Sequence, residues 1–341
     1  MFQVNQVTNF GNGVWSKTRY DGRMVLITGA TGFIGSHLVD TLLAKGQQVR
    51  VLARPKGGKP KPQDNLEVFA APLTTDGLSR AADGCSVVYH LAGITRASSE
   101  AEFMWANAEG TRVAAVGAAQ AGARLVYVSS LAAAGTGTIE QPRKVSDTPA
   151  PITMYGQSKL GGEIRVLETP NLEWCILRPP GVYGQRDKDF LFAFQAAKRG
   201  FFPILGNPKR AYTLVYVHDL INAIIGCAEH PNAVGKTYFA GHAVPVSYST
   251  ILETLARLFN KPFNPISLPN GLLEVAANAG ELGRFFGQVG LINKSRQRDL
   301  LSPGWVCDVS AIESELGVTA QTNLETGFAK TLEWYKAQKL L

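Results

Sequence analysis

The chain alternates short apolar runs with longer segments whose apolar residues recur at helical spacing. The runs are rich in β-branched residues and predict buried strands at 24–28, 48–53, 66–70, 87–92, 125–130 and 174–178. Helix-like segments lie between them, at 33–45, 100–121 and 155–168. This alternation predicts an α/β fold, a doubly wound parallel sheet covered by helices on both faces. Ligands of such sheets bind at the carboxyl ends of the strands.

Beyond residue 180 the pattern becomes less regular. It predicts helices at 190–199, 220–228, 250–259 and 323–339, a Gly/Pro/basic turn at 206–210 and a strand at 213–217. We expect a smaller C-terminal α/β lobe that selects the substrate. The expected division is a disordered leader or tag at 1–23, a sheet domain at 24–180 and the substrate lobe at 181–341. The chain can recross between the last two.

A glycine motif follows the first predicted strand and opens the first predicted helix. It reads Thr28-Gly29-Ala30-Thr31-Gly32-Phe33-Ile34-Gly35. Glycines at this spacing let backbone amides approach a pyrophosphate, and a helix N-terminus favours its negative charge. The position between a strand and a helix favours this interpretation over an ordinary glycine-rich turn. We therefore predict a dinucleotide-binding Rossmann domain, with cofactor contacts from Gly29, Thr31, Gly32, Phe33, Ile34 and Gly35.

The end of the second predicted strand bears on the choice between NAD and NADP. Sites that prefer NAD place an acidic residue there to bind the ribose hydroxyls. Here the strand ends with Arg54, and Lys56 follows. A guanidinium suits the 2′-phosphate of NADP. The alternative is a surface arginine beside the basic loop 55–62, so NADP is predicted and NAD stays open.

Composition narrows the class of protein. The 341 residues are 45% hydrophobic and 18% charged, as in a globular protein with a substantial core. The four cysteines form no C-x-x-C pair and suit buried free thiols in a reducing, cytoplasmic setting. No run reaches the about 20 apolar residues of a spanning helix. The formal charge of +7 lies partly in the loop 55–62, which lacks interleaved aromatics, so no nucleic-acid partner is predicted.

A second group of residues carries acid–base chemistry. Tyr155 and Lys159 are four apart and share one face of a predicted helix. An ammonium beside a phenol favours the phenolate and lowers its high pKa. Upstream, Ser129-Ser130 end a predicted strand, where a serine hydroxyl can bind a substrate carbonyl while tyrosine exchanges the proton. The alternative is that the two serines have no catalytic role and simply form the polar end of the strand.

Together these motifs resemble the extended short-chain dehydrogenase/reductases, the NAD-dependent epimerase/dehydratase family. The resemblance runs from about Met24 to the C-terminus and is less specific beyond Gly184. The motifs that carry it, in family order, are Gly29-x-x-Gly32-x-x-Gly35, Asn107-x-x-Gly110-Thr111, Ser129-Ser130, Tyr155-x-x-x-Lys159, Arg178-Pro179-Pro180 and Val217-His218-Asp219-Leu220.

This resemblance implies roles for individual residues. Ser130, Tyr155 and Lys159 would be catalytic, with Lys159 also holding the nicotinamide ribose. Further cofactor contacts are implied for Leu91, Ala92, Gly93, Asn107 and Pro179. Substrate contacts are expected from Thr95, Arg96, Tyr183 and Arg210. Family members often pair through helices, so a homodimer is implied.

Departures from the family pattern reduce the range of reactions that we expect this chain to catalyse. The segment 131–134 lacks the acidic pair of the dehydratases, and Gly181 stands where many nucleotide-sugar epimerases have Asn. Ala134 replaces an aromatic residue, and 70–73 lacks the usual acid. Phenylalanines in the substrate-facing segment favour the reductase branch, although core packing is expected for most of them; they are Phe190, Phe192, Phe194, Phe201 and Phe202.

The first hypothesis is an NADP-preferring oxidoreductase that acts on a ketone or secondary alcohol of an apolar, steroid-, lipid- or flavonoid-like small molecule. The alternative is a nucleotide-sugar epimerase with the same three catalytic residues. A second alternative is a non-catalytic dinucleotide-binding subunit. His90 and His218 have no second ligand at metal spacing, so both are expected to be structural and no metal site is predicted.

Overall fold

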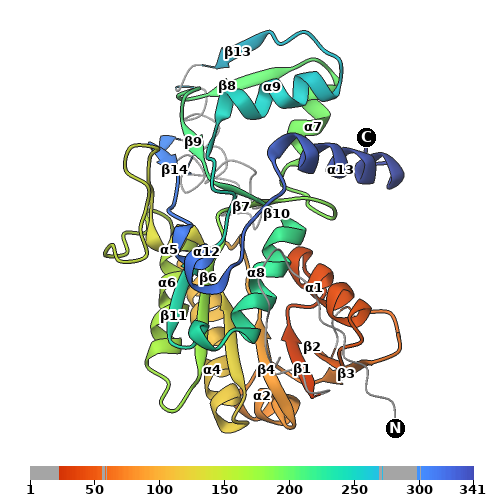
Figure 1. Ribbon diagram of the computed structural model, residues 1–341, viewed down its shortest axis with the longest axis vertical. Helices are drawn as coiled ribbons and strands as arrows, with labels where there is room; N and C mark the ends of the chain where they lie inside the picture. Colours follow the sequence, from red (N-terminus) through yellow and green to blue (C-terminus); the bar gives the residue numbers. More distant parts are fainter. Residues whose placement is uncertain (1–22, 56–57, 59, 269–270, 272–297, 300) are drawn as a thin grey trace.

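The computed structural model describes residues 23–55, 58, 60–268, 271, 298–299 and 301–341. The expected leader and Lys56 therefore lie outside the described residues, apart from Arg23. Figure 1 shows two lobes, one built on the main sheet and one above it.

The main sheet is parallel and has seven strands in the order β3-β2-β1-β4-β5-β6-β11. Its strands are β1 (Met24–Thr28), β2 (Val49–Ala53), β3 (Leu66–Ala70), β4 (Cys85–His90), β5 (Arg124–Val128), β6 (Trp174–Arg178) and β11 (Lys236–Phe239). The first six match the predicted apolar runs to within two residues at each end. The doubly wound parallel sheet is confirmed.

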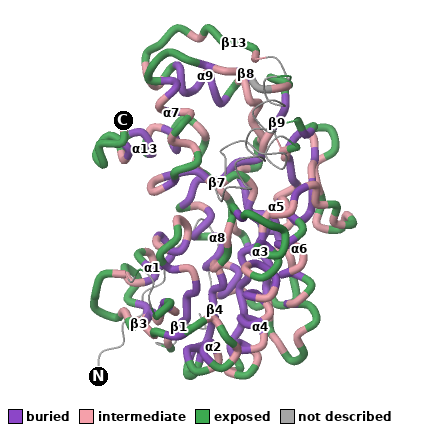
Figure 2. Tube along the Cα trace, turned by 180° about the vertical axis from the view of Figure 1, so that it is seen from behind, coloured by how far each residue is buried: buried purple, intermediate pink, exposed green. Residues whose placement is uncertain are grey.

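Helices cover both faces of this sheet. On one face lie α1 (Phe33–Ala44), α8 (Val217–Glu229) and α12 (Ser310–Leu316), which share a core cluster with the strands. On the other lie α2 (Thr75–Ala82), α4 (Gly110–Gln120) and α6 (Met154–Leu167). The strands are buried between these layers (Figure 2). Short helical turns follow β5 and α8, namely α5 (Leu131–Ala134) and η2 (Pro231–Ala233).

The helix predicted at 100–121 is divided into three parts. A short α3 (Glu100–Phe103) leads into a π-helical stretch, η1 (Met104–Glu109), and then into α4. Asn107 lies inside the π-helical stretch and is buried. The helix predicted at 100–121 is therefore confirmed, but apolar periodicity cannot distinguish this local widening from a regular α-helix, so the π-helical stretch was not predicted.

The second lobe is built from short elements. Its strands are β7 (Gly181–Tyr183), β8 (Phe202–Leu205), β9 (Ala211–Tyr212), β10 (Leu214–Tyr216), β12 (Val246–Ser247), β13 (Pro265–Leu268) and β14 (Gly304–Trp305). Its helices are α7 (Leu191–Lys198), α9 (Tyr248–Leu258) and α13 (Leu324–Ala337). Aromatic and aliphatic side chains from α7, α9 and α13 form its core.

The chain crosses between the lobes more than once. After β6 it enters the second lobe, returns as α8 and β11, and enters the second lobe again as β12. The boundary at residue 180 stays a prediction; α8 and the edge strand β11, from beyond it, pack with the main sheet.

The structure also bears on the predictions about the cysteines and about membrane-spanning helices. All four cysteines are buried and free, as predicted. Within the described ranges, no helix combines the length and apolar character needed to cross a membrane.

Candidate functional site

The glycine turn between β1 and α1 forms a backbone cradle. Gly29 has a φ of +76°, and the Gly32 amide donates to its carbonyl oxygen at 3.0 Å. A Cβ on Gly35 would lie 2.1 Å from that oxygen, so this position requires glycine. The N-terminus of α1 has neither a side-chain cap nor an acidic residue in its first turn. Its amides can therefore bind an anion, which fits the pyrophosphate of a dinucleotide.

The segment after β4 lies against this turn. The amides of Leu91 and Ala92 donate to the carbonyl and hydroxyl oxygens of Thr28, at 3.2 and 3.3 Å. A Cβ on Gly29 would lie 2.7 Å from the Ala92 nitrogen. The predicted cofactor residues of the two segments therefore lie side by side. Thr31, Gly32 and Gly93 are exposed, and Phe33, Ile34, Leu91 and Ala92 are half-buried.

Arg54 follows β2 directly, as the sequence predicts. Its side chain is exposed and has no hydrogen bond or ion pair among the residues that the structure describes. β2 is the neighbour of β1, so Arg54 lies at the strand end next to the one that leads into the glycine turn. An exposed guanidinium there can meet a phosphate on the adenosine side of a dinucleotide.

Ser130 and Tyr155 come together at the end of β5. Ser130 caps α5 and accepts a hydrogen bond from the Ala132 amide at 3.1 Å. Tyr155 lies in the first turn of α6, and a hydrogen bond with the Ser130 hydroxyl opposes the rise in its pKa that burial causes. Gly156 permits this approach, because a Cβ there would lie 2.3 Å from the Ala132 carbonyl oxygen.

Lys159 lies one turn further along α6 and is 5% exposed. Its Nζ donates to the carbonyl oxygen of Val128 at 2.7 Å and lies 4.5 Å from the centre of the Tyr127 ring. Burial lowers its pKa to about 7, against the opposing charge of Glu163. The sequence predicted that Lys159 would lower the pKa of Tyr155. In this structure the net shift of that pKa is upward, because burial outweighs the hydrogen bond from Ser130.

The buried amine of Lys159 should make folding depend on pH. Its pKa is about 7 in the fold and 10.5 in an exposed chain. Between these values the unfolded chain holds a proton that the folded chain has released, so the free energy of unfolding should rise with pH across that window. The penalty is fully present below about pH 7. Urea unfolding of the wild type and of Lys159→Met across this pH window measures the expected rise in the free energy of unfolding.

The difference in the free energy of unfolding between the wild type and Lys159→Met separates the contribution of Lys159 from that of the other groups that titrate. The wild type should gain stability relative to Lys159→Met as pH rises. Lys61→Met is the matched control, because Lys61 is exposed. If the wild type and Lys159→Met follow parallel curves, the amine is not destabilised by burial.

A buried charged group that the sequence did not predict lies behind Ser130, Tyr155 and Lys159. Glu163 accepts hydrogen bonds from Arg178 Nε and Nη2 at 2.9 and 2.6 Å, and from the Ser129 hydroxyl at 2.5 Å. All three side chains are buried, and the Arg178 guanidinium lies 5.7 Å from the centre of the Phe239 ring. The spacing Tyr155, Lys159, Glu163 on one helical face was the available signal. This network ties α6 to β5 and β6 below Ser130.

His90 and Asn107 are structural residues near the site. Burial and the charge of Lys159 lower the pKa of His90 to about 3, and its Nδ1 pairs with the Thr28 hydroxyl at 2.7 Å. The Asn107 side chain exchanges hydrogen bonds with the backbone of Ile94 at 2.8 and 2.9 Å and donates to the Ser158 hydroxyl at 2.9 Å. Asn107 therefore holds the loop after β4, and its role as a direct cofactor contact stays a prediction.

Pro179 and the predicted substrate residues after β4 lie near the carboxyl end of the sheet. The Pro179 carbonyl accepts a hydrogen bond from the Leu131 amide at 2.8 Å, which links the end of β6 to α5. Thr95 and Arg96 are exposed. Arg96 pairs with Asp189 at 2.8 Å, so an ion pair connects the loop after β4 to the second lobe just before α7. Thr95 and Arg96 thus lie where the lobes meet.

Tyr183 and Arg210, also predicted to contact substrate, lie in the core of the second lobe. Tyr183 is 2% exposed and packs against the rings of Phe190, Tyr216 and Phe328. Arg210 is 1% exposed, and its guanidinium lies 5.3 and 5.7 Å from the ring centres of Tyr212 and Tyr248. Both side chains pack inside the lobe, and their assignment to the substrate site stays a prediction.

The five phenylalanines of the substrate-facing segment divide between core and surface. Phe194 and Phe202 are buried in the lobe core, and Phe190 is half-buried. Phe192 and Phe201 are exposed, at 66% and 39%. Core packing therefore accounts for three of them, as the sequence led us to expect for most.

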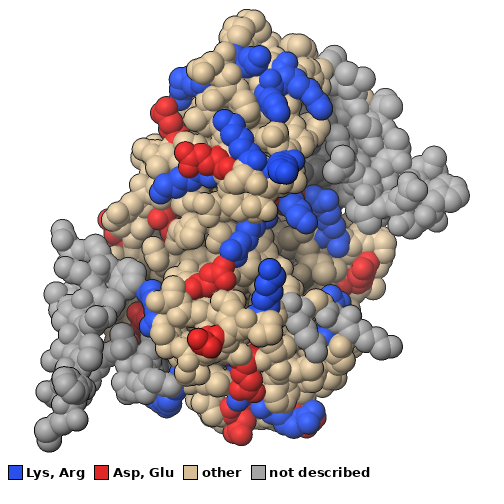
Figure 3. Space-filling view, turned by 90° about the vertical axis from the view of Figure 1, so that its right-hand side faces the viewer, with Lys and Arg blue, Asp and Glu red and all other residues tan. Residues whose placement is uncertain are grey.

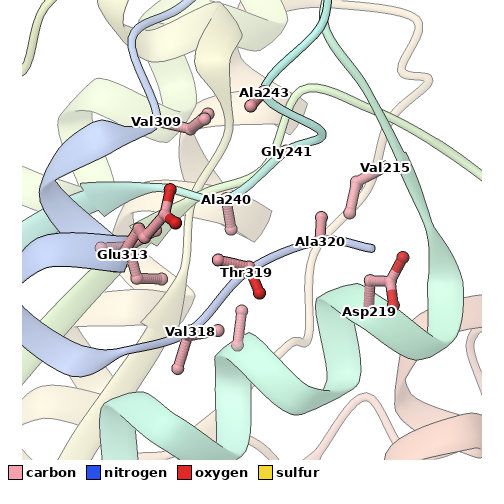
Figure 4. Close-up of a pocket in the computed structure, with 12 residues that line it drawn as sticks. Val215, Asp219, Ala240, Gly241, Ala243, Val309, Glu313, Val318, Thr319 and Ala320 are labelled. Atoms are coloured by element: carbon pink, nitrogen blue, oxygen red, sulfur yellow. The ribbon is translucent and has the colours of Figure 1, made fainter. Parts of the chain in front are cut away.

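A cavity of about 140 Å³ lies between α8 and α12 (Figure 4). Asp219 and Glu313 line it from opposite sides, with Thr319 between them. Its lining includes none of Ser130, Tyr155 and Lys159, so it is separate from the predicted catalytic residues. Among the described residues, no three His, Cys, Asp or Glu side chains gather as a metal site would require.

The sequence profile of the NAD dependent epimerase/dehydratase family matches residues 25–241. The chain belongs to this family. The matched range contains the glycine cradle, Ser130, Tyr155, Lys159 and the Glu163–Arg178 pair. Membership makes the chain a nicotinamide-dependent enzyme of the extended short-chain dehydrogenase/reductase type.

Several members of the family are similar over nearly the whole chain. The ceramide reductase of Caulobacter vibrioides is 31% identical over 321 residues, covering 92% of this chain and 95% of that protein. The UDP-glucose 4-epimerase of Vibrio cholerae is 26% identical, covering 91% and 95%. The solved structure of MoeE5 in complex with UDP-glucuronic acid and NAD has a TM-score of 0.72 at 25% identity, covering 92% of this chain and 99% of that one.

Proposed function

We propose that this protein is an NADPH-dependent reductase of a ketone on an apolar, lipid-like substrate, and that Ser130, Tyr155 and Lys159 are its catalytic residues. The observation that carries the proposal is the close contact of α5, capped by Ser130, with the first turn of α6, which holds Tyr155, at the carboxyl edge of the sheet. At the same edge lies the glycine cradle at the N-terminus of α1. A proton donor and a dinucleotide cradle on one edge are what hydride transfer to a carbonyl requires.

Each of the three proposed catalytic residues has its own role in the reaction. The bound dinucleotide supplies the hydride. Ser130 donates a hydrogen bond to the substrate carbonyl oxygen, and Tyr155 delivers its proton to the same oxygen as negative charge develops there. Lys159, when protonated, stabilises the resulting phenolate through its charge. Run in reverse, Tyr155 accepts the proton of a secondary alcohol.

Two observations support a lipid-like substrate. The segment after Ser130 is apolar and packed, since Leu131 and Ala134 share a core cluster with Phe239 and Cys307. It therefore offers no titratable side chain for elimination of water. The similarity to a ceramide reductase points the same way, because a ceramide carries a secondary alcohol on a long apolar chain.

The test is stoichiometric cofactor turnover by the purified full chain. A keto-ceramide in detergent should consume NADPH one for one and yield the alcohol, and ceramide with NADP⁺ should run in reverse. UDP-glucose is the comparison substrate. Interconversion of UDP-glucose and UDP-galactose without net cofactor oxidation would establish the epimerase instead, an alternative that similarity to the Vibrio cholerae enzyme favours. Tight dinucleotide binding with no turnover on either substrate would indicate a non-catalytic subunit.

NADP preference is proposed from Arg54. Arg54→Ala should weaken NADPH binding about 10- to 100-fold, the loss expected for a charged hydrogen bond to phosphate, and leave NADH binding nearly unchanged. Isothermal titration of both cofactors measures this. Arg80→Ala, which removes another exposed arginine of the same lobe, is the control. Tighter binding of NADH than NADPH by the wild type would refute the preference.

A homodimer through α6 and η1 is also proposed. Exposed apolar side chains lie on these neighbouring elements, and the Arg165–Glu109 ion pair at 3.1 Å joins them. These side chains are Met104, Trp105, Ile164 and Leu167, with Trp105 75% exposed. Trp105→Glu should shift the molar mass in solution from dimer to monomer, by light scattering. A wild-type monomer at micromolar concentration would contradict the proposal.

A further inference from the structure

A basic and aromatic surface lies on the outer side of α7, apart from the catalytic groups. α7 buries Phe194 and Ala197 in the core of the second lobe. Phe192 and Arg199 are seven residues apart, lie on the opposite side of the helix and are exposed. The amide of Phe201 donates to the Ala196 carbonyl at 2.9 Å, which places this second exposed ring at the end of the same helix.

The C-terminal end of α13 extends this surface. The Gln195 side chain of α7 donates to the carbonyl oxygen of Leu340 at 3.3 Å, so the two segments lie side by side (Figure 1). The segments 190–201 and 334–341 contain no Asp or Glu. They contribute the cations Lys198, Arg199, Lys336 and Lys339, all exposed. We call Phe192, Phe201 and these four cations the α7 surface.

The four cations are available to a partner. None of them has an ion pair or a side-chain hydrogen bond among the described residues. By contrast, some arginines of the sheet lobe are paired, such as Arg80 with Asp76 and Arg112 with Glu109. Figure 3 shows Lys and Arg side chains gathered over the upper lobe, with few acidic side chains between them. Unpaired positive charge on one face attracts an anionic partner.

The exposed rings indicate which anionic partner fits. Large apolar side chains beside lysine and arginine are typical of protein surfaces that lie in the headgroup region of a membrane, where rings insert and cations meet anionic lipids. The α7 surface also adjoins the seam between the lobes. α7 begins two residues after Asp189, which pairs with Arg96 of the sheet lobe.

We propose that the α7 surface docks the protein on an anionic lipid bilayer, with Phe192 and Phe201 in the headgroup region. Docking there brings the seam between the lobes to the membrane, where a lipid ketone can pass to Tyr155. The role in substrate delivery depends on the proposed function, whereas the binding itself does not.

The test measures binding of the full chain to vesicles by co-sedimentation. Vesicles of phosphatidylcholine mixed with phosphatidylglycerol should bind the protein, with loss of binding at high salt, and vesicles of phosphatidylcholine alone should bind little. The double variant Lys198→Glu with Arg199→Glu should bind at least about tenfold more weakly. Phe192→Ala should also weaken binding.

Matched controls separate the α7 surface from net charge and general apolarity. Lys61→Glu with Lys144→Glu changes the net charge equally on the other lobe, and Ile139→Ala shortens an apolar side chain that is 55% exposed. Both should bind vesicles like the wild type. Equal losses in control and α7-surface variants, or no binding to anionic vesicles, would overturn the proposal. So would binding to duplex DNA that anionic vesicles fail to displace.

Activity readouts distinguish this proposal from the proposed function. With keto-ceramide in detergent, the Lys198→Glu, Arg199→Glu variant should turn over like the wild type; with the same substrate in anionic vesicles, its rate should fall with its binding. Vesicle binding that depends on the α7 surface, without turnover of any ketone, would reject the proposed function and keep the docking. Turnover in vesicles that is unaffected by the variant would reject docking and keep the function.

Discussion

Tyr155→Phe is expected to lower kcat for ketone reduction by about 10²- to 10⁴-fold, the contribution of a positioned general acid. The substitution removes one oxygen and keeps the ring against Phe103, with which it packs at 6.2 Å. Cofactor affinity and the unfolding midpoint should therefore change little. Steady-state rates with NADPH and ketone, together with NADPH titration of the variant, measure both effects.

Tyr183→Phe is the matched control for this prediction. It also removes a buried tyrosine hydroxyl, but from the core of the second lobe, where that hydroxyl donates to the Asn323 carbonyl at 3.4 Å. Its kcat should stay near the wild-type value. A Tyr155→Phe enzyme with nearly normal kcat, or a Tyr183→Phe enzyme as impaired as Tyr155→Phe, would show that the proton comes from elsewhere.

Glu163→Gln should cause a large loss of stability. Glu163 and Arg178 are 3% and 5% exposed and form a bidentate pair. Removing one partner leaves the other charge buried without compensation, which costs about 3–5 kcal/mol. We therefore expect the free energy of unfolding in urea titrations to fall by roughly that amount. Arg178→Met should have a comparable effect.

The double variant Glu163→Gln with Arg178→Met removes both charges and should be less destabilised than the sum of the single variants. Glu168→Gln is the control, because it breaks the exposed Arg165–Glu168 pair on the same helix, which is worth within about 1 kcal/mol. If the loss of stability in the double variant equals the sum of the losses in the two single variants, the two charges are not coupled.

The sequence predicted the sheet well because its signals are local. Each strand of the Rossmann half is a short β-branched run, and each connecting helix carries its own apolar period. The glycine turn was equally clear from the sequence, since the spacing of its glycines between a strand and a helix is a local signal. Gly35 is required by a contact inside the turn, with the Gly29 carbonyl oxygen, whereas the close contact of Gly29 with Ala92 joins distant segments. The same holds for Tyr155 and Lys159, whose helical spacing is a local property.

What the sequence did not predict depends on contacts between distant segments. Glu163 pairs with Arg178 of β6, and Tyr183 is enclosed by Phe328 from the last helix. Arg210, predicted as a substrate contact, is buried beside Tyr212 and Tyr248. Burial of this kind is set by tertiary packing, for which composition and periodicity carry no signal. Asn107, in the π-helical stretch, likewise bonds to Ile94, a residue outside its own helix.

The recrossing of the chain bears on how this enzyme can be divided. A fragment that stops after β6 would lack β11, which pairs with β6 along its whole length, and α8, which covers one face of the sheet. Such a fragment would present an unpaired strand edge and a bare apolar layer to water. The nucleotide-binding half is therefore not a detachable module. Domain exchange between relatives would have to transplant the loops of the second lobe onto an intact sheet.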